Sequence, residues 1–216
     1  MLRMPIIPSV FNFSPESTIS QLEHMLAGLQ IDAVHFDEID DLPKYYELLQ
    51  KYHATADIHL LGNQPMEDLK KIINMKLAVP ARVSVHVECC TDRAEFCVLA
   101  SNNNITPGLA FRLPTPISAD PAFYEGFKYV HLLCIDENSG ILGFDETVYS
   151  KARKLRDILD DTFTVTIDAG VKEQHVHPAS LSGISNMVMG SAIFKIHDPL
   201  SVVVSLNKAL NCARSL

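Results

Sequence analysis

Eight short apolar segments recur along the chain, and stretches with helical spacing lie between them. Continuous apolar strands that alternate with helices predict a parallel sheet covered on both faces. Eight such units are the number that closes a (β/α)8 barrel, also called a TIM barrel, so this α/β fold is the expected one. The expected strands are residues 6–11, 33–36, 55–60, 82–87, 106–111, 129–134, 164–167 and 186–189.

The helical period is clearest in two of the intervening stretches, 18–29 and 146–159. Their apolar residues fall on one face: Ile19, Leu22, Met25, Leu26 and Leu29 in the first, and Val148, Ala152, Leu155 and Leu159 in the second. The chain has 216 residues, 47% of them hydrophobic, which is enough for one sizeable core. No linker-like or low-complexity segment divides it, and the proline-rich stretch 107–121 is expected to form the loop after the fifth strand. We therefore expect a single domain spanning residues 1–216.

Charge and cysteine content limit the classes of partner and compartment. The chain carries 18 basic and 26 acidic residues, a formal net charge of −8, without a Lys/Arg cluster, so a nucleic-acid partner is not expected. The first 13 residues contain Pro5, Pro8 and one basic residue, and they indicate a buried strand rather than a signal peptide. No stretch is long enough to predict a membrane span. An odd number of cysteines, five, without the spacing of a disulfide framework favours a cytoplasmic protein.

Ionisable side chains fall at the ends of the expected strands, where a barrel of this kind carries its active site. His35 and Asp37 end the second strand, His59 the third, His86 the fourth and Asp168 the seventh. One such residue alone is more often a structural cap. Together, the four residues His35, Asp37, His59 and Asp168, on three strands, form a mixed nitrogen and oxygen set. Such a set suits zinc, iron(II), manganese or cobalt. The sequence therefore predicts a metal-dependent enzyme.

In the order and spacing of these motifs, the sequence resembles the ribulose-phosphate 3-epimerase family. The similarity extends over residues 6–194, nearly the whole chain. Each fragment is weak alone, and their order is what makes the resemblance specific. The matching fragments are Pro8-Ser9, His35-Phe36-Asp37, Asp57-Ile58-His59-Leu60, His86-Val87-Glu88, Gly108-Leu109-Ala110, Pro114-Thr115-Pro116, Ile167-Asp168-Ala169-Gly170 and Gly190-Ser191-Ala192-Ile193-Phe194.

The resemblance implies a cytoplasmic isomerase of carbohydrate metabolism that inverts C3 of a ketose phosphate, as in the pentose phosphate pathway. Removing the C3 proton leaves an enediolate, whose charge a divalent cation can stabilise. Two carboxylates are then needed, one on each face of that planar species. By resemblance, His35, Asp37, His59 and Asp168 bind one divalent ion, and Asp37 and Asp168 are also the catalytic acid/base pair.

The resemblance also implies a sugar-phosphate site and a homo-oligomer, either a dimer or a hexamer. In this fold a phosphate sits on backbone N–H groups of the last two strand-to-helix loops. The residues that match substrate contacts are Ser9, His59, His86, Gly140, Gly170, Gly190 and Ser191. A tight turn with an N-cap serine is the alternative interpretation of Gly190-Ser191.

Two loops depart from the family pattern. Where the family has Asn-Pro-Gly-Phe-Gly-Gly-Gln after the sixth strand, this chain has residues 136–142, Asp-Glu-Asn-Ser-Gly-Ile-Leu, with one glycine and two acids. The segment between Asp37 and His59 is also short for the family. A shorter lid and fewer backbone donors predict that ribulose 5-phosphate is a poor substrate by the family's standard and that a bulkier ketose phosphate, such as allulose 6-phosphate, fits better.

Other functions stay open at this point. Decarboxylases and aldolase-like synthases of the orotidine-decarboxylase type carry Asp-x-Lys-x-x-Asp near the third strand, whereas this chain has Asp57-Ile58-His59 without a lysine. A non-catalytic barrel that binds a sugar phosphate or a protein would explain the altered loops but not the four retained ligands. Two lesser patterns, the Cys89-Cys90 pair and His175-Val176-His177, indicate packing and a solvated or phosphate-proximal loop rather than metal sites.

Overall fold

Eight parallel strands form one sheet that curls into a barrel in the computed structural model, which describes residues 6–28, 31–136 and 143–213, with side chains only as far as 206 in the last range. The strand order is β1-β8-β7-β6-β5-β4-β3-β2, and a parallel bridge between Ser9 and His35 brings the two edges together. The strands are β1 (Ile6–Pro8), β2 (Ala33–Phe36), β3 (Thr55–Leu60), β4 (Ala81–His86), β5 (Ile105–Phe111), β6 (Tyr129–Leu133), β7 (Thr164–Asp168) and β8 (Asn186–Met189).

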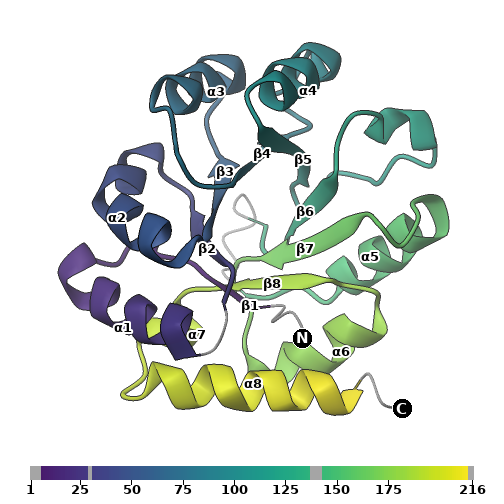
Figure 1. Cartoon of the computed structure of the whole chain (residues 1–216). Helices are drawn as coiled ribbons and strands as arrows, with labels where there is room; N and C mark the ends of the chain where they lie inside the picture. The colour runs from purple at the N-terminus through teal and green to yellow at the C-terminus, as the bar shows by residue number, and fades with distance from the viewer. Residues whose placement is uncertain (1–5, 29–30, 137–142, 214–216) are drawn as a thin grey trace.

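Helices surround the barrel on the outside (Figure 1). They are α1 (Pro15–Gly28), α2 (Leu42–Tyr52), α3 (Pro65–Asn74), α4 (Arg93–Asn102), α5 (Thr147–Ile158), α6 (Val176–Leu181), α7 (Ser191–Phe194) and α8 (Pro199–Ala213). Individual residues explain where several helices begin. Pro15 and Pro65 occupy the first turns of α1 and α3, and the Asp92 carboxylate caps α4 by accepting from the Glu95 N–H. Between β5 and β6 the described connection has only a short 3-10 turn, Pro121–Tyr124. Helix α8 contacts both α1 and α6.

The interior of the barrel differs from the layer between strands and helices. The large apolar cluster lies on the outer faces of the strands, against the helices. Inside, a small separate apolar cluster joins Ile7, Ala33 and Val188, from three neighbouring strands. Many of the other buried side chains inside are polar: His35, Asp57, His59, Ser84, His86, His131, Thr166 and Asp168. Because buried polar groups cost free energy unless they are paired, this polar interior indicates a functional site.

The predicted fold is confirmed, strand by strand. The expected bounds of the second, third and eighth strands match the structure, and four others differ by one residue at one end or both. The first strand ends at Pro8 rather than residue 11, because Phe13 N–H donates to the Val10 carbonyl and Asn12 has a left-handed φ of 63°, which turns the chain. The two predicted helices correspond to α1 and α5, whose ends lie within one to three residues of the expected ones.

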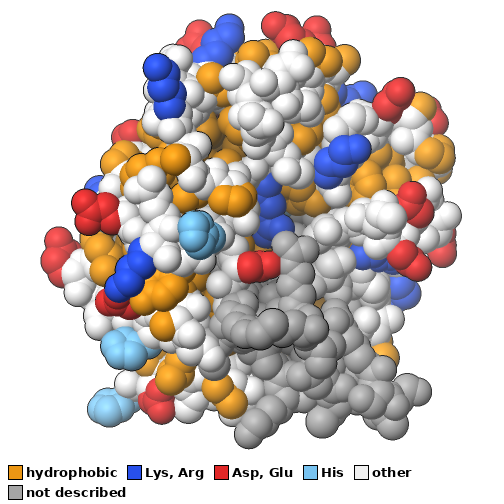
Figure 2. All heavy atoms as spheres, viewed as in Figure 1, with side chains coloured by type: hydrophobic (Ala, Val, Ile, Leu, Met, Phe, Trp, Pro, Cys, Tyr) orange, Lys and Arg blue, Asp and Glu red, His pale blue; other side chains and the backbone are white. Residues whose placement is uncertain are grey.

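The surface carries both signs of charge. On the face shown in Figure 2, acidic and basic side chains are interspersed. Within the described residues, no helix combines the length and the apolar character needed to cross a bilayer. The expectations about nucleic acid and subunit number stay predictions.

Candidate metal centre and active site

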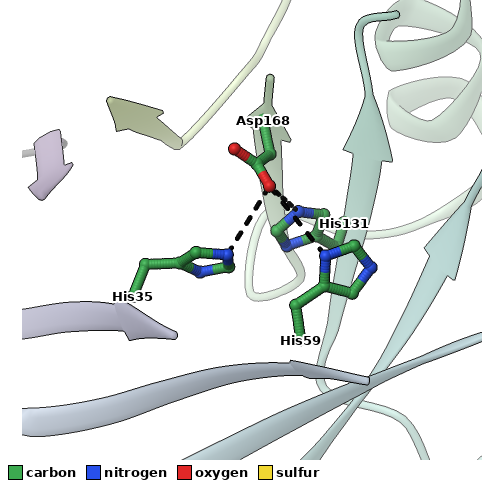
Figure 3. Close-up of side chains that lie close together, drawn as sticks. All are labelled: His35, His59, His131 and Asp168. Carbon is green, nitrogen blue, oxygen red and sulfur yellow. Dashed lines mark hydrogen bonds and ion pairs between the residues drawn. The ribbon is translucent and has the colours of Figure 1, made fainter. Parts of the chain in front are cut away.

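Three histidines and an aspartate meet inside the barrel near the carboxyl ends of their strands (Figure 3). His35 comes from β2, His59 from β3, His131 from β6 and Asp168 from the end of β7. Each offers one nitrogen or oxygen, and these four atoms lie within 4.8 Å of one another. All four residues are buried. Inward-facing positions on parallel strands of a barrel bring residues that are far apart in sequence close together.

Asp37 approaches the same point from the loop after β2. Its Oδ1 lies 3.3 Å from His35 Nε2 and 3.3 Å from His59 Nδ1. Asp168 Oδ2 faces the same two nitrogens at 3.5 and 3.9 Å. The structure therefore brings together His35, Asp37, His59 and Asp168, the four residues that the sequence predicts as ligands.

His35 is held from behind by a buried ion pair. Its Nδ1 lies 2.8 Å from Asp57 Oδ2, and Arg82 Nε donates to Asp57 Oδ1 at 2.7 Å. The guanidinium of Arg82 in turn lies over the Tyr129 ring, 5.3 Å from its centroid. Burial alone raises the pKa of Asp57, but Arg82 and His35 outweigh it and hold that pKa well below its usual range. A carboxylate fixed in this way orients the imidazole and leaves Nε2 facing the cluster.

His59 is held from behind by a second chain of contacts. Its Nε2 lies 2.9 Å from His86 Nε2, and His86 Nδ1 lies 3.3 Å from Glu88 Oε2. Burial and the neighbouring His59 lower the pKa of His86 to about 3, so that His86 is neutral at neutral pH. The Glu88 carboxylate also accepts from the Arg112 N–H and the Thr115 hydroxyl. This chain leaves His59 Nδ1 as the nitrogen that faces Asp37 and Asp168.

The donor set fits a divalent cation. His59 Nδ1 is buried without a hydrogen-bond partner among the described atoms, although two carboxylates face it. Burial lowers the pKa of His35, but Asp37 and Asp168 outweigh it and raise that pKa well above its ordinary value. The cluster therefore favours added positive charge, which is what a metal ion supplies. Imidazole nitrogen with carboxylate oxygen is a donor set for zinc, iron(II), manganese or cobalt rather than calcium.

Sequence analysis missed His131. Its Nε2 lies 3.2 Å from Asp168 Oδ2, and its ring stacks on His59 with centroids 4.4 Å apart. Burial and the nearby His59 lower the pKa of His131. A signal was present, because His131 is two residues before the end of an apolar strand and so shares the inward face with Leu133. Its position inside the strand, rather than at the end, hid it.

A cavity of about 340 Å³ opens over the cluster. Asp37, His59 and Asp168 line its metal end. The predicted substrate contacts Ser9, Gly170, Gly190 and Ser191 line it too, together with Asn12 and Lys195. His86 does not appear among the lining residues, since it lies behind His59. Gly140 falls in residues 137–142, outside the described residues.

Backbone geometry explains which residues occupy the turns around the cavity. A Cβ on Gly190 would lie 3.2 Å from the Ser9 carbonyl oxygen, a tight contact, so glycine favours this close approach of two segments of the chain. Ala169 and Gly170 both have φ of 71°, which turns the chain immediately after Asp168. The Ala169 N–H donates to Asp168 Oδ1 at 2.6 Å. That bond leaves Oδ2 to face the histidines.

The Cys89-Cys90 pair and His175, from the two lesser sequence patterns, make packing and hydrogen-bond contacts away from the metal cluster. The His175 ring stacks on Phe144 at 3.7 Å, and its Nδ1 accepts from the Lys172 N–H. Cys90 is buried, and Cys89 contacts Asn63. Neither belongs to the candidate metal group found in the described part of the chain.

Comparisons with known proteins identify the family. The sequence pattern of the Ribulose-phosphate 3 epimerase family matches residues 6–194. A ribulose-phosphate 3-epimerase from Buchnera aphidicola (subsp. Acyrthosiphon pisum) is 27% identical over 197 residues, covering 85% of each chain. One from Mycobacterium leprae is 26% identical over 189 residues, covering 82% of this chain and 83% of its own.

Solved structures share the fold at lower identity. The crystal structure of 3-hexulose-6-phosphate synthase from Salmonella typhimurium superposes with a TM-score of 0.71 at 13% identity, covering 97% of this chain and all of the other. This likeness concerns the barrel alone. The match over residues 6–194 and the relatives along most of the chain show that the protein belongs to the ribulose-phosphate 3-epimerase family.

Proposed function

We propose that the protein is a metal-dependent epimerase that inverts C3 of a ketose phosphate, with His35, Asp37, His59 and Asp168 as its metal ligands. One observation carries the proposal: Asp37 follows β2 and Asp168 ends β7, two strands separated by β8 and β1, yet both carboxylates face His35 Nε2 and His59 Nδ1. Inversion at a carbon through a planar intermediate needs an acid/base group on each face of that carbon, and these two carboxylates can supply the pair.

In the proposed mechanism each aspartate serves one face of the substrate. One carboxylate removes the proton from C3, which leaves a planar enediolate, and the other returns a proton to C3 from the opposite face. The cation, when bound, supplies the positive charge that stabilises the enediolate. Asp57 and the His86–Glu88 pair hold His35 and His59 in place, so that the two carboxylates keep their positions through the reaction.

The far end of the cavity is proposed to hold the phosphate. Gly170, Gly190 and Ser191 line it, and their backbone can approach a ligand closely because two of the three positions carry no Cβ. Lys195 adds a fixed positive charge there. A dianion at this end would place the sugar carbons toward Asp37 and Asp168.

The decarboxylase or synthase alternative receives no support from the site. At β3, where that class has a lysine, the chain has Asp57 bound to Arg82 and His59 facing the cluster. A non-catalytic barrel would not need two carboxylates on one pair of imidazoles.

Solvent exchange at C3 tests the proposal directly. Metal-replete protein is incubated in deuterated water with ribulose 5-phosphate and, separately, with allulose 6-phosphate, and the C3 proton signal and the epimer ratio are followed by NMR. We expect loss of the C3 proton and formation of the 3-epimer with at least one of the two, and faster conversion of the hexulose phosphate. Absence of both exchange and epimer with either sugar would exclude the proposed reaction on these two substrates.

A further inference from the structure

We infer that His131 is a fifth protein ligand of the metal, in addition to the four that the family motifs supply. The inference rests on the metal site of the proposed function and goes beyond it. His131 is completely buried on β6, and it shares no motif with the other four residues. Its place in the cluster follows only from the geometry (Figure 3).

The first argument is the crowding around one oxygen. Asp168 Oδ2 has His131 Nε2 at 3.2 Å, His35 Nε2 at 3.5 Å and His59 Nδ1 at 3.9 Å. Of the three contacts, that of His131 is a hydrogen bond, while His35 and His59 approach the same oxygen at longer distances. Donor atoms that share an ion at about 2.0–2.2 Å lie roughly 3–4.4 Å from one another. The three contacts fall in that range.

The second argument is the stacking and burial of the three rings. The His131 ring centroid lies 4.4 Å from that of His59 and 5.4 Å from that of His35, and all three side chains are buried. Three imidazoles packed together in this way are costly unless their nitrogens bind something, and one cation would serve all three.

The third argument is the side from which His131 approaches. Asp37, His59 and Asp168 line the cavity, whereas His131 and His35 do not. In the sheet register His131 pairs with Thr166, two positions before the Leu133–Asp168 pair, so it sits deeper in the barrel. A ligand in that place holds the ion from the barrel side and leaves the cavity side open to substrate oxygens.

The contacts behind each ring also predict how much the three histidines contribute to metal affinity. His35 is oriented by Asp57 and His59 by His86, but the second nitrogen of His131 has no such support among the described residues. Because outer partners strengthen a metal-ligating histidine, we expect His131 to contribute less to affinity than either of the other two.

Metal binding by variants tests the inference without reference to catalysis. Zinc affinity is measured by competition with a chromophoric chelator, and the coordination of added cobalt(II) by its visible spectrum. His131→Leu should weaken zinc binding by about 100-fold or more, since loss of an outer partner alone costs about 10–100-fold, and it should change the cobalt spectrum. The control, Thr166→Val, alters the neighbouring buried position in the same layer and should change neither. His35→Ala should weaken binding more than His131→Leu.

Unchanged zinc affinity and an unchanged cobalt spectrum in His131→Leu would overturn the inference while leaving the four-ligand site intact. If the wild-type protein binds no zinc or cobalt, both this inference and the proposed metal site fail. A measurement on wild-type protein covers the case in which His131→Leu does not fold. With nitrogen-15 in the histidine rings, zinc should shift a ring nitrogen of His131 together with those of His35 and His59, and an unmoved His131 signal would contradict ligation.

Discussion

The two ends of the cavity are built differently. At the metal end, side chains on β2, β3 and β7 meet Asp37, from the loop after β2, at contacts of 3.3–3.9 Å, and Asp57 and His86 hold His35 and His59 from behind. At the end proposed to bind phosphate, called the phosphate end below, turns after β7 and β8 present Gly170, Gly190 and the exposed Ser191 and Lys195. Strands give one rigid geometry, while turns tolerate change. We expect changes at the metal end to affect metal binding and turnover, and changes at the phosphate end to affect KM.

Loss of either aspartate at the metal end should have the largest effect. Asp37→Asn and Asp168→Asn each remove one of the two proton-transfer groups and a proposed metal ligand, so kcat should fall by at least about 10²–10⁴ in each. Steady-state epimerisation with metal supplied measures this. Solvent exchange at C3 survives in at most one of the two variants, since each retains a base for only one face.

The control for these variants is Asp161→Asn, an exposed carboxylate just after α5 that should leave kcat unchanged. Near-normal turnover in either metal-end variant, with metal content and melting temperature retained, would contradict the scheme in which two carboxylates transfer protons.

The support behind His35 should show the second largest effect. Asp57→Asn leaves the Arg82 guanidinium without its charged partner inside the barrel, and breaking a buried ion pair costs about 3–5 kcal/mol of unfolding free energy. Zinc affinity should also fall by about 10–100-fold, because His35 loses its carboxylate partner. Denaturant unfolding and chelator competition measure the two effects separately.

The double variant Asp57→Asn/Arg82→Met separates the effect on stability from the effect on zinc affinity. Removing the unpaired charge should restore much of the unfolding free energy but not the zinc affinity, because the introduced amide still lacks the charge that orients His35. If zinc affinity recovers together with stability, Asp57 acts on folding alone and the difference between the two ends is smaller than proposed.

The two ends also differ in how far they could be predicted from sequence. The strand-end residues His35, Asp37, His59 and Asp168 were predictable because strands and their order were, and because parallel strands end on one side. The ion pair of Asp57 with Arg82 was not, since a charged residue inside an apolar strand gives no indication of its partner on the next strand. His131 was hidden for the same reason. At the phosphate end the glycines were predicted from motifs, but Lys195 was not, because its role depends on how the chain turns after β8.

At the phosphate end, Lys195→Met should raise KM by about tenfold and leave kcat nearly unchanged. Among the described residues that line the cavity, Lys195 is the fixed positive charge, and one charged contact to an exposed phosphate is worth about 1.4 kcal/mol, which corresponds to tenfold. The effect should shrink at high salt because the side chain is exposed. Lys70→Met, on the exposed side of α3, is the matched control. A fall in kcat with KM unchanged would place Lys195 with the reacting groups instead.

The smallest effect is expected at Ala169, which joins the two ends. Its φ of 71° costs a non-glycine residue roughly 1–2 kcal/mol. Ala169→Gly removes that strain but gains backbone freedom in the unfolded chain, worth about 0.5–1 kcal/mol, so the net gain should be about 0.5–1 kcal/mol and raise the melting temperature by roughly 1–4 °C. Ala94→Gly, at an exposed helical position in α4, should lower it instead. If Ala169→Gly stabilises the protein but lowers zinc affinity, then the strained turn that donates to Asp168 Oδ1 also fixes that ligand, and the metal end depends on a turn as well as on strands.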